Sequence, residues 1–152
     1  MNHQWTITRT DSSNKDFQHL VHQLDQYLAI RNGDDNAFFA QFNKIDRIRH
    51  VVLAYRDEQP VGCGAMKEYD PHTMEIKRMF VPAALRGKGI ARLVLAGLES
   101  WARELGYKRC ILETGNDMRD AVGLYTKSGY STIPNYGQYA GVDSSVCFEK
   151  VL

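Results

Sequence analysis

The segment from Glu75 to Leu105 restricts the fold of this chain more than any other part of its sequence. It begins with apolar residues typical of a buried strand, passes through Arg86-Gly87-Lys88-Gly89, and continues into a long amphipathic helix. Six apolar residues are predicted to share one face of that helix: Ile90, Leu93, Val94, Leu98, Trp101 and Leu105. A strand that leads through a glycine turn into such a helix predicts helices packed on a sheet, which is the layered arrangement of an α/β domain.

The rest of the sequence alternates between strand and helix patterns. Strands are predicted at residues 4–9, in three successive segments within 50–81 that are separated by turns at 56–60 and 69–73, at 107–114, and at 144–152. Further helices are predicted at 14–30, around 38–45 and at 117–128. Asp11, Ser12 and Ser13 can cap the first helix, and Gly106 and Gly129 are expected to end the last two. There is no linker, repeat or low-complexity segment, so residues 1–152 are predicted to form one domain.

Composition and charge exclude several classes of function. The net charge of +1 gives no overall attraction to nucleic acid or to anionic membranes, so neither is predicted as a partner. The chain has no apolar segment long enough to span a bilayer, and its first residues lack a signal-peptide pattern. Cys63, Cys110 and Cys147 lie in apolar, strand-like runs, which predicts reduced, buried thiols in a cytoplasmic protein.

The glycine turn is suited to bind a phosphate or pyrophosphate. The first N–H groups of a helix lack partners within the helix, and the helix dipole favours negative charge there. Gly87 and Gly89 would allow these amides to approach an anion closely, while Arg86 and Lys88 add positive charge. A plain tight turn is the alternative interpretation of the same four residues.

Two familiar phosphate-binding motifs fit this turn poorly. A Walker A loop requires Ser or Thr after Gly-Lys, but Lys88 is followed by Gly89. A dinucleotide-binding fingerprint has three glycines near the first strand of a βαβ unit, whereas this turn comes late in the chain, after several strands.

Two longer motifs carry a resemblance to a known family. The segment RGKGIA, Arg86 to Ala91, resembles the acyl-CoA loop of the GNAT superfamily of N-acetyltransferases, whose pattern is Arg/Gln-x-x-Gly-x-Gly/Ala. The segment AVGLYTKSGY, residues 121–130, resembles the second motif of that family. The resemblance extends over nearly the whole chain. It implies a mixed, mostly antiparallel sheet of about seven strands, with about four helices on both faces.

The resemblance also implies where acetyl-CoA would bind. The backbone amides of Arg86, Gly87, Lys88, Gly89, Ile90 and Ala91 would hold its pyrophosphate. The backbone of Met79, Phe80 and Val81 would pair with its pantetheine arm. Many members of the family have a CoA-contacting Asn three residues before the Ala of the second motif. That position is Met118 here, and Asn116 is the nearest candidate to replace it.

The chemistry of acetyl transfer to an amine calls for a base and an acid. An alkylamine with a pKa of about 10 must lose a proton, and the departing thiolate gains from a proton donor. Tyr125 matches the tyrosine of the second motif and is the predicted acid, although a core aromatic residue would also fit its position. Glu75 is the predicted base, acting directly or through a water, and Glu113 is the alternative.

The resemblance predicts an acetyl-CoA-dependent N-acetyltransferase that transfers the acetyl group directly to an acceptor. Tyr136 and Tyr139, in the aromatic loop Ile133 to Asp143, are predicted to line the acceptor site. The acceptor is predicted to be a primary amine of a small molecule or amino acid, with a peptide or protein amine as an alternative. An acyl-CoA sensor without turnover and a nucleotide-binding enzyme are the alternative functions, and a homodimer is one candidate assembly. Cys63 is not favoured as a covalent carrier, and His19 and His22 lack the partners of a metal site.

Overall fold

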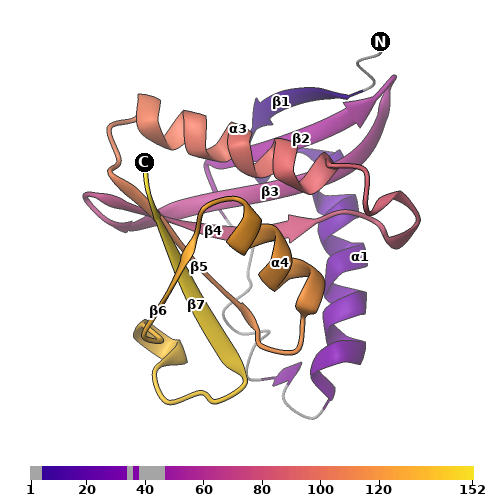
Figure 1. Cartoon of the computed structure of the whole chain (residues 1–152). Helices are drawn as coiled ribbons and strands as arrows, with labels where there is room; N and C mark the ends of the chain where they lie inside the picture. Colours follow the sequence, from indigo (N-terminus) through magenta and orange to yellow (C-terminus); the bar gives the residue numbers. More distant parts are fainter. Residues whose placement is uncertain (1–4, 34–35, 38–46) are drawn as a thin grey trace. The chain divides into compact units, whose positions relative to one another are not determined.

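The computed structural model describes residues 5–33, 36–37 and 47–152. The elements in chain order are β1 (Thr6–Thr10), α1 (Lys15–Asn32), β2 (His50–Arg56), β3 (Gln59–Asp70), β4 (Thr73–Phe80), the short helix η2 (Ala83–Leu85), α3 (Ile90–Glu104), β5 (Arg109–Gly115), α4 (Arg119–Lys127), β6 (Ser131–Ile133), the short helix η3 (Gly137–Tyr139) and β7 (Ser145–Val151) (Figure 1). The helix predicted around residues 38–45 lies outside the described residues.

The strands form a seven-stranded sheet in the order β1-β2-β3-β4-β5-β7-β6. Among the strand pairs with a described register, β4 and β5 are parallel and the others are antiparallel. This confirms the predicted mixed, mostly antiparallel sheet. The described part of the chain contains three α-helices rather than about four. None of these helices is long and apolar enough to cross a bilayer.

The chain divides into two compact units. The first contains Met1–Lys67 and Lys77–Leu98, and the second contains Glu68–Ile76 and Glu99–Leu152. Strands β3 and β4 and helix α3 therefore contribute residues to both units.

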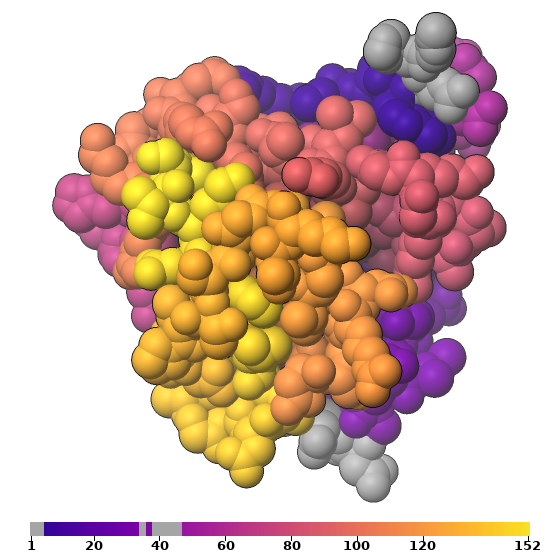
Figure 2. Space-filling view, viewed as in Figure 1, coloured from indigo at the N-terminus to yellow at the C-terminus, as the bar shows by residue number. Residues whose placement is uncertain are grey.

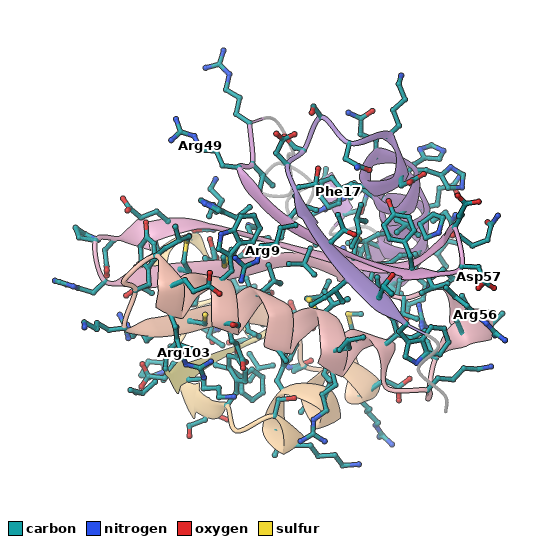
Figure 3. All side chains as sticks on the ribbon, turned by 90° about the horizontal axis from the view of Figure 1, so that it is seen from above. Arg9, Phe17, Arg49, Arg56, Asp57 and Arg103 are labelled. Atoms are coloured by element: carbon teal, nitrogen blue, oxygen red, sulfur yellow. The ribbon has the colours of Figure 1, made fainter. Side chains whose placement is uncertain are left out.

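In the first unit, helices cover both faces of the strands. The side of α1 that carries Phe17 packs against one face, and this cluster of buried residues contains Phe17, Leu20, Val21, Leu24, Val51, Leu53, Cys63, Ala65 and Phe80. Figure 3 labels Phe17 on α1 above the strands. The opposite face meets α3, because a Cβ atom added at Gly97 would lie 3.4 Å from Val52. Successive residues of β2 thus point to opposite helices, as the period of a strand requires.

In the second unit, β5 pairs with β7 along its whole length, from Arg109 opposite Val151 to Gly115 opposite Ser145. On the other side of β5, only Thr73, Met74 and Glu75 of β4 have described partners. The ring of Tyr125 in α4 packs against that of Phe148 in β7, with 6.0 Å between centroids. This contact places α4 on one face of β7, so the side chain of Tyr125 points toward β7 from that face.

The observed helix ends and turns match the predicted ones except at the start of α1 and at the end of α3. Gly106 and Gly129 end α3 and α4 with φ angles of 94° and 95°, as predicted. The turn between β2 and β3 contains Asp57, with a φ of 56°, and Figure 3 labels Asp57 beside Arg56. The expectation that residues 11–13 cap α1 was wrong, because the side chain of Asn14 accepts the hydrogen bond from the amide of Phe17.

The predicted apolar face of α3 was wrong at its end. Leu105 is 45% exposed, since the helix ends at Glu104 and the chain turns away through Gly106. Leu95 and Ala102 are buried on this helix instead, next to the correctly predicted Val94 and Leu98.

Candidate functional site

The glycine turn of the first unit has the backbone conformation of an anion-binding loop. Gly87 and Gly89 have φ angles of 79° and 87°, a region that other residues rarely adopt. Among the described residues other than the chain neighbours, no atom lies within 4 Å of a Cβ built on Gly87 or Gly89. The backbone conformation, rather than a lack of space, therefore requires glycine at both positions. The amide of Leu93 donates to the carbonyl of Gly89, which marks the first turn of α3. The amides of Ile90 and Ala91 precede this bond and lie at the helix end that attracts anions.

The side chain of Arg86 is used within the first unit. Its Nε donates a 2.8 Å hydrogen bond to the carbonyl of Val81, and its guanidinium lies 5.0 Å from the ring centroid of Tyr27 in α1. The guanidinium also lies 5.9 Å from the ring centroid of Phe80. Arg86 therefore ties the loop to the end of β4 and to α1. Lys88 is exposed at the tip of the loop.

The predicted pantetheine-binding residues alternate across the end of β4. Phe80 is buried in the cluster against α1. Val81 and the sulfur of Met79 lie beside Gly62 and Gly64 on the other face. The side chains of these three residues thus pack within the first unit. The predicted pairing of their backbone with the pantetheine arm stays a prediction.

In the second unit, the predicted base contacts a predicted acceptor residue. The hydroxyl of Tyr136 donates a 2.7 Å hydrogen bond to Oε2 of Glu75, which is only 8% exposed. The Tyr136 ring lies between Tyr69 and Tyr139, with centroid distances of 5.3 Å and 5.8 Å and edge-on geometry in both pairs. Burial and the nearby Glu75 raise the pKa of Tyr136, so its hydroxyl stays protonated as a donor.

The alternative base, Glu113, belongs to the same group of residues. Its Oε2 accepts a 2.6 Å hydrogen bond from the hydroxyl of Ser145. Burial raises the pKa of Tyr139, with smaller contributions from the charges of Glu113 and Glu75. We call Glu75, Glu113, Tyr136, Tyr139 and Ser145 the tyrosine–glutamate cluster. It joins β4, β5, the loop after β6 and the start of β7 within the second unit.

The predicted acid, Tyr125, is 6% exposed in α4. Its ring packs edge-on against Tyr130, at a centroid distance of 5.8 Å. Burial raises the pKa of Tyr125, and the charge of Glu113 raises it further. A phenol with a raised pKa stays protonated at neutral pH, which is the state that a proton donor requires.

Asn116 has a local role in the second unit. Its side-chain amide donates a 2.8 Å hydrogen bond to the carbonyl of Asp143, and its backbone amide donates to the carbonyl of Ser144. These bonds fasten the end of the loop Ile133 to Asp143 next to β5. The contact with CoA predicted for Asn116 stays a prediction.

The three thiols are buried, as the sequence indicated. Burial raises the pKa of Cys63 and of Cys110 to about 12, and it also raises the pKa of Cys147. Thiols of this kind are poor nucleophiles at neutral pH. Within the described residues, no group of His, Cys, Asp and Glu is arranged to hold a metal ion.

Sequence reasoning missed three residues. Tyr69 packs against Tyr136, Ser145 donates to Glu113, and the buried Arg78 of β4 pairs with Asp25 of α1. Tyr69 and Ser145 carry no motif, so only the folded chain reveals their contacts. Arg78 follows Lys77 in a strand that also contains Glu75, so the sequence did not indicate which of these charged residues is buried against a partner.

Comparison with known proteins agrees with these features. The sequence model of the Acetyltransferase (GNAT) family matches residues 11–130. The chain is 31% identical to the IAA acetyltransferase of Azospirillum brasilense over 150 residues, which cover 97% of each protein. A structure from Klebsiella pneumoniae, assigned as a candidate acyl-CoA N-acyltransferase, has a TM-score of 0.83, 28% identity and 99% coverage of both chains. A GNAT acetyltransferase from Elizabethkingia anophelis, solved with acetyl-CoA bound, has a TM-score of 0.70 at 19% identity, covering 99% of this chain and 100% of that one, and shares the fold.

Proposed function

Because the chain belongs to the GNAT family of acetyltransferases, it is an acetyl-CoA-dependent acyltransferase, and we propose that it acetylates the primary amine of a small molecule or amino acid. The acetyl group moves directly from the thioester to the amine. The observation that supports this proposal best is the tyrosine–glutamate cluster with Tyr125 nearby, because it brings carboxylates and protonated phenols together. These are the groups that deprotonation of an amine and protonation of a thiolate require.

Glu75 is the proposed base. An acceptor amine arrives mostly as an ammonium ion at neutral pH and must lose a proton before it can attack the thioester carbonyl. Glu75 has the Tyr136 hydroxyl on Oε2, so Oε1 is the oxygen that we assign to this proton, either directly or through a water. Glu113, whose Oε2 is held by Ser145, is the alternative base.

Tyr125 is the proposed acid. When the tetrahedral intermediate collapses, the carbon–sulfur bond breaks and the sulfur receives the electron pair. A hydroxyl that remains protonated can donate its proton to that sulfur, and the raised pKa of Tyr125 keeps the proton on the phenol until then.

The proposed cofactor contacts follow the loop and the strand of the first unit. The loop residues Arg86 to Ala91 would bind the pyrophosphate through their amides, and the open space around Gly87 and Gly89 leaves room for such a group. The backbone of Met79, Phe80 and Val81 would pair with the pantetheine arm, and Asn116 would contact CoA. We further propose that residues 1–152 act as a single acetyltransferase domain in the cytoplasm.

The acceptor side is proposed to lie at the tyrosine–glutamate cluster. Tyr139 and Tyr136 supply apolar rings with polar hydroxyls next to two carboxylates, a combination that suits a positively charged amine. One relative is named an IAA acetyltransferase. That name describes the relative, and the experiment below identifies the acceptor of this chain.

A panel of amines tests the proposed function. Release of CoA thiol would be followed with acetyl-CoA and each of a set of alkylamines, polyamines, amino acids and short peptides. We expect turnover with at least one small primary amine. Binding of acetyl-CoA by calorimetry without turnover of any panel member would favour the sensor, and turnover of peptides alone would favour a protein acceptor.

A further inference from the structure

The register of the sheet places two carboxylates of the second unit on the same face. Glu75 of β4 lies opposite Ile111 of β5, and Glu113 follows two residues later on β5. Paired residues of neighbouring strands point to the same side of a sheet, and so do residues two positions apart on one strand. Glu75 and Glu113 are therefore diagonal neighbours, whose Cα atoms lie roughly 8 Å apart.

Each of these carboxylates is held by a neutral hydroxyl. Tyr136 donates to Oε2 of Glu75 at 2.7 Å, and Ser145 donates to Oε2 of Glu113 at 2.6 Å. A hydroxyl carries no charge, so these bonds orient the two carboxylates without neutralising them. A carboxylate has about four acceptor positions, so one hydroxyl does not fill them.

The burial of Glu75 points to a ligand with a positive charge. Glu75 is 8% exposed, and within the described part of the chain no lysine, arginine or histidine forms an ion pair with it. Arg109 lies on the same face but has other partners, because its Nη1 bonds to Glu149 at 2.7 Å and its Nη2 lies 4.0 Å from Asp70. Burying an ionised carboxylate beside a neutral donor is costly, and a cationic ligand lowers that cost.

Aromatic rings adjoin the two carboxylates. Burial raises the pKa of Tyr139, and the charges of Glu113 and Glu75 raise it further, so both carboxylates act on the same hydroxyl. Tyr139 packs edge-on against Tyr136, which packs edge-on against Tyr69. Tyr139 is 3% exposed and Tyr69 is 45% exposed, so this row of rings extends from the interior of the second unit to solvent. Aromatic rings next to carboxylates attract ammonium groups and disfavour anions.

We propose that the acceptor is a diamine, which carries a second positive charge and no carboxylate. This inference rests on the proposed acetylation of a small amine. Glu75 takes one proton from the reacting ammonium group, and Glu113 holds the second ammonium group, which keeps its protons. The amine nitrogen bonds to the thioester carbonyl carbon, the carbon–sulfur bond breaks, and the products are a monoacetylated diamine, CoA and a released proton. An amino acid would add a carboxylate to a face that already carries two, so it should bind more weakly.

The test compares acceptors of the same length that differ at one end. 1,4-Diaminobutane, pentylamine and 4-aminobutanoate carry an ammonium group, a methyl group and a carboxylate at the end remote from the reacting amine. We expect kcat/KM of the wild-type protein to be at least about tenfold higher for the diamine than for pentylamine, and to be lowest for 4-aminobutanoate. In Glu113→Gln the ratio of kcat/KM for the diamine to that for pentylamine should fall close to one, mainly through the KM of the diamine.

A matched control and a second readout keep the outcomes distinct. Glu68→Gln removes another carboxylate of the second unit that accepts from a tyrosine hydroxyl, that of Tyr107, and should keep the wild-type ratio. Binding of 1,4-diaminobutane would also be measured by calorimetry in the presence of CoA, which has no acetyl group to transfer. We expect Glu113→Gln to bind the diamine at least about tenfold more weakly than wild type. Ser145→Ala, which frees Oε2 of Glu113, should shift both readouts in the same direction and serves if Glu113→Gln does not fold.

Two results would overturn the inference. One is wild-type acetylation of pentylamine or 4-aminobutanoate as efficiently as of the diamine. The other is an equal loss of kcat for all acceptors in Glu113→Gln with an unchanged ratio, which would make Glu113 the base instead of the site of the second charge. If wild type acetylates none of these compounds, the proposed function fails on this panel, and the calorimetric result still decides whether Glu113 binds a diamine.

Discussion

The hydroxyl of Tyr136 and the carboxylate of Glu75 form a 2.7 Å hydrogen bond between residues that are 61 positions apart in the sequence. Tyr136 follows β6, and Figure 2 shows the segment between β6 and β7 at the surface of the second unit. The ring of Tyr136 is held edge-on by Tyr69 and Tyr139, so its hydroxyl has little freedom to turn away from Glu75. A residue expected to line the acceptor site thus also fixes the orientation of the proposed base.

Replacing Tyr136 by Phe should lower kcat, while the ring and its packing remain. Glu75 loses the hydrogen bond that holds its Oε2, so its carboxylate is oriented less well toward the acceptor, and we expect kcat to fall by about tenfold. Tyr69→Phe is the matched control, since it changes a neighbouring ring that does not donate to Glu75, and its kcat should equal the wild-type value. A Tyr136→Phe variant with unchanged kcat and a raised acceptor KM would leave Tyr136 as a residue of acceptor binding alone.

Replacing Glu75 by Gln keeps the shape of the side chain but removes its ability to accept a proton. We expect kcat/KM at neutral pH to fall about a hundredfold or more, the usual contribution of a general base, and the acidic limb to flatten. Acetyl-CoA affinity, measured by calorimetry, should stay within twofold. Glu113→Gln tests the alternative base in the same assay. The larger loss of rate in Glu113→Gln would transfer the role of the base to Glu113.

Local sequence patterns predicted much of the fold because they reflect local physics. The turn from β4 into α3 was predicted from Gly87 and Gly89, and both have positive φ angles that other residues rarely adopt. The boundaries of α1 were close to the prediction, but its cap was not, because several neighbouring polar residues could serve and only Asn14 has the required geometry.

The sequence patterns did not predict the contacts between residues of the candidate site. The sequence indicated Glu75, Glu113, Tyr136 and Tyr139 separately, from motifs and composition. Their mutual contacts depend on the register of β5 and β7, in which Glu113 lies opposite Cys147, and on the path of the loop before β7. Register is a long-range property, so a local pattern cannot supply it. The ion pair of Arg78 with Asp25 was missed for the same reason.

Replacing Tyr125 by Phe removes the proposed proton donor and keeps the packing against Tyr130 and Phe148. The rate of a single turnover should fall roughly a hundredfold or more, as expected for loss of a general acid, while acetyl-CoA affinity barely changes. Tyr107→Phe is the control, because it also removes a hydroxyl, one bonded to Glu68 in the second unit. A normal single-turnover rate in Tyr125→Phe would show that the ring serves only for packing.

Replacing Gly89 by Glu should weaken acetyl-CoA binding by at least about tenfold, or about 1.4 kcal/mol, because a carboxylate would repel the pyrophosphate and the side chain would strain the loop. Gly106→Glu is a closely matched control. Gly106 has a similar φ angle of 94° and equally open space around its Cβ position, but it ends α3 instead of beginning it. Both variants should lose similar stability in thermal unfolding, and only Gly89→Glu should lose affinity by calorimetry. Equal affinities would place the pyrophosphate elsewhere.

The buried carboxylate of Glu99 makes a prediction about stability. Its Oε2 accepts a 2.8 Å hydrogen bond from the Tyr130 hydroxyl, and its Oε1 pairs with Nζ of Lys150 at 2.9 Å. The side chain of Glu99 is almost fully buried, whereas Lys150 reaches solvent. Replacing Lys150 by Met would leave the carboxylate buried with only the phenol as a partner, and the free energy of unfolding should fall by roughly 3 kcal/mol.

A second substitution separates this cause from a simple loss of packing. Glu99→Gln in the Lys150→Met background removes the unpaired charge while keeping an acceptor for Tyr130. The double variant should therefore be more stable than Lys150→Met alone, as measured by urea unfolding of both single variants and the double variant. If the losses of unfolding free energy in the two single variants add up to the loss in the double variant, the two side chains stabilise the second unit independently of their charges.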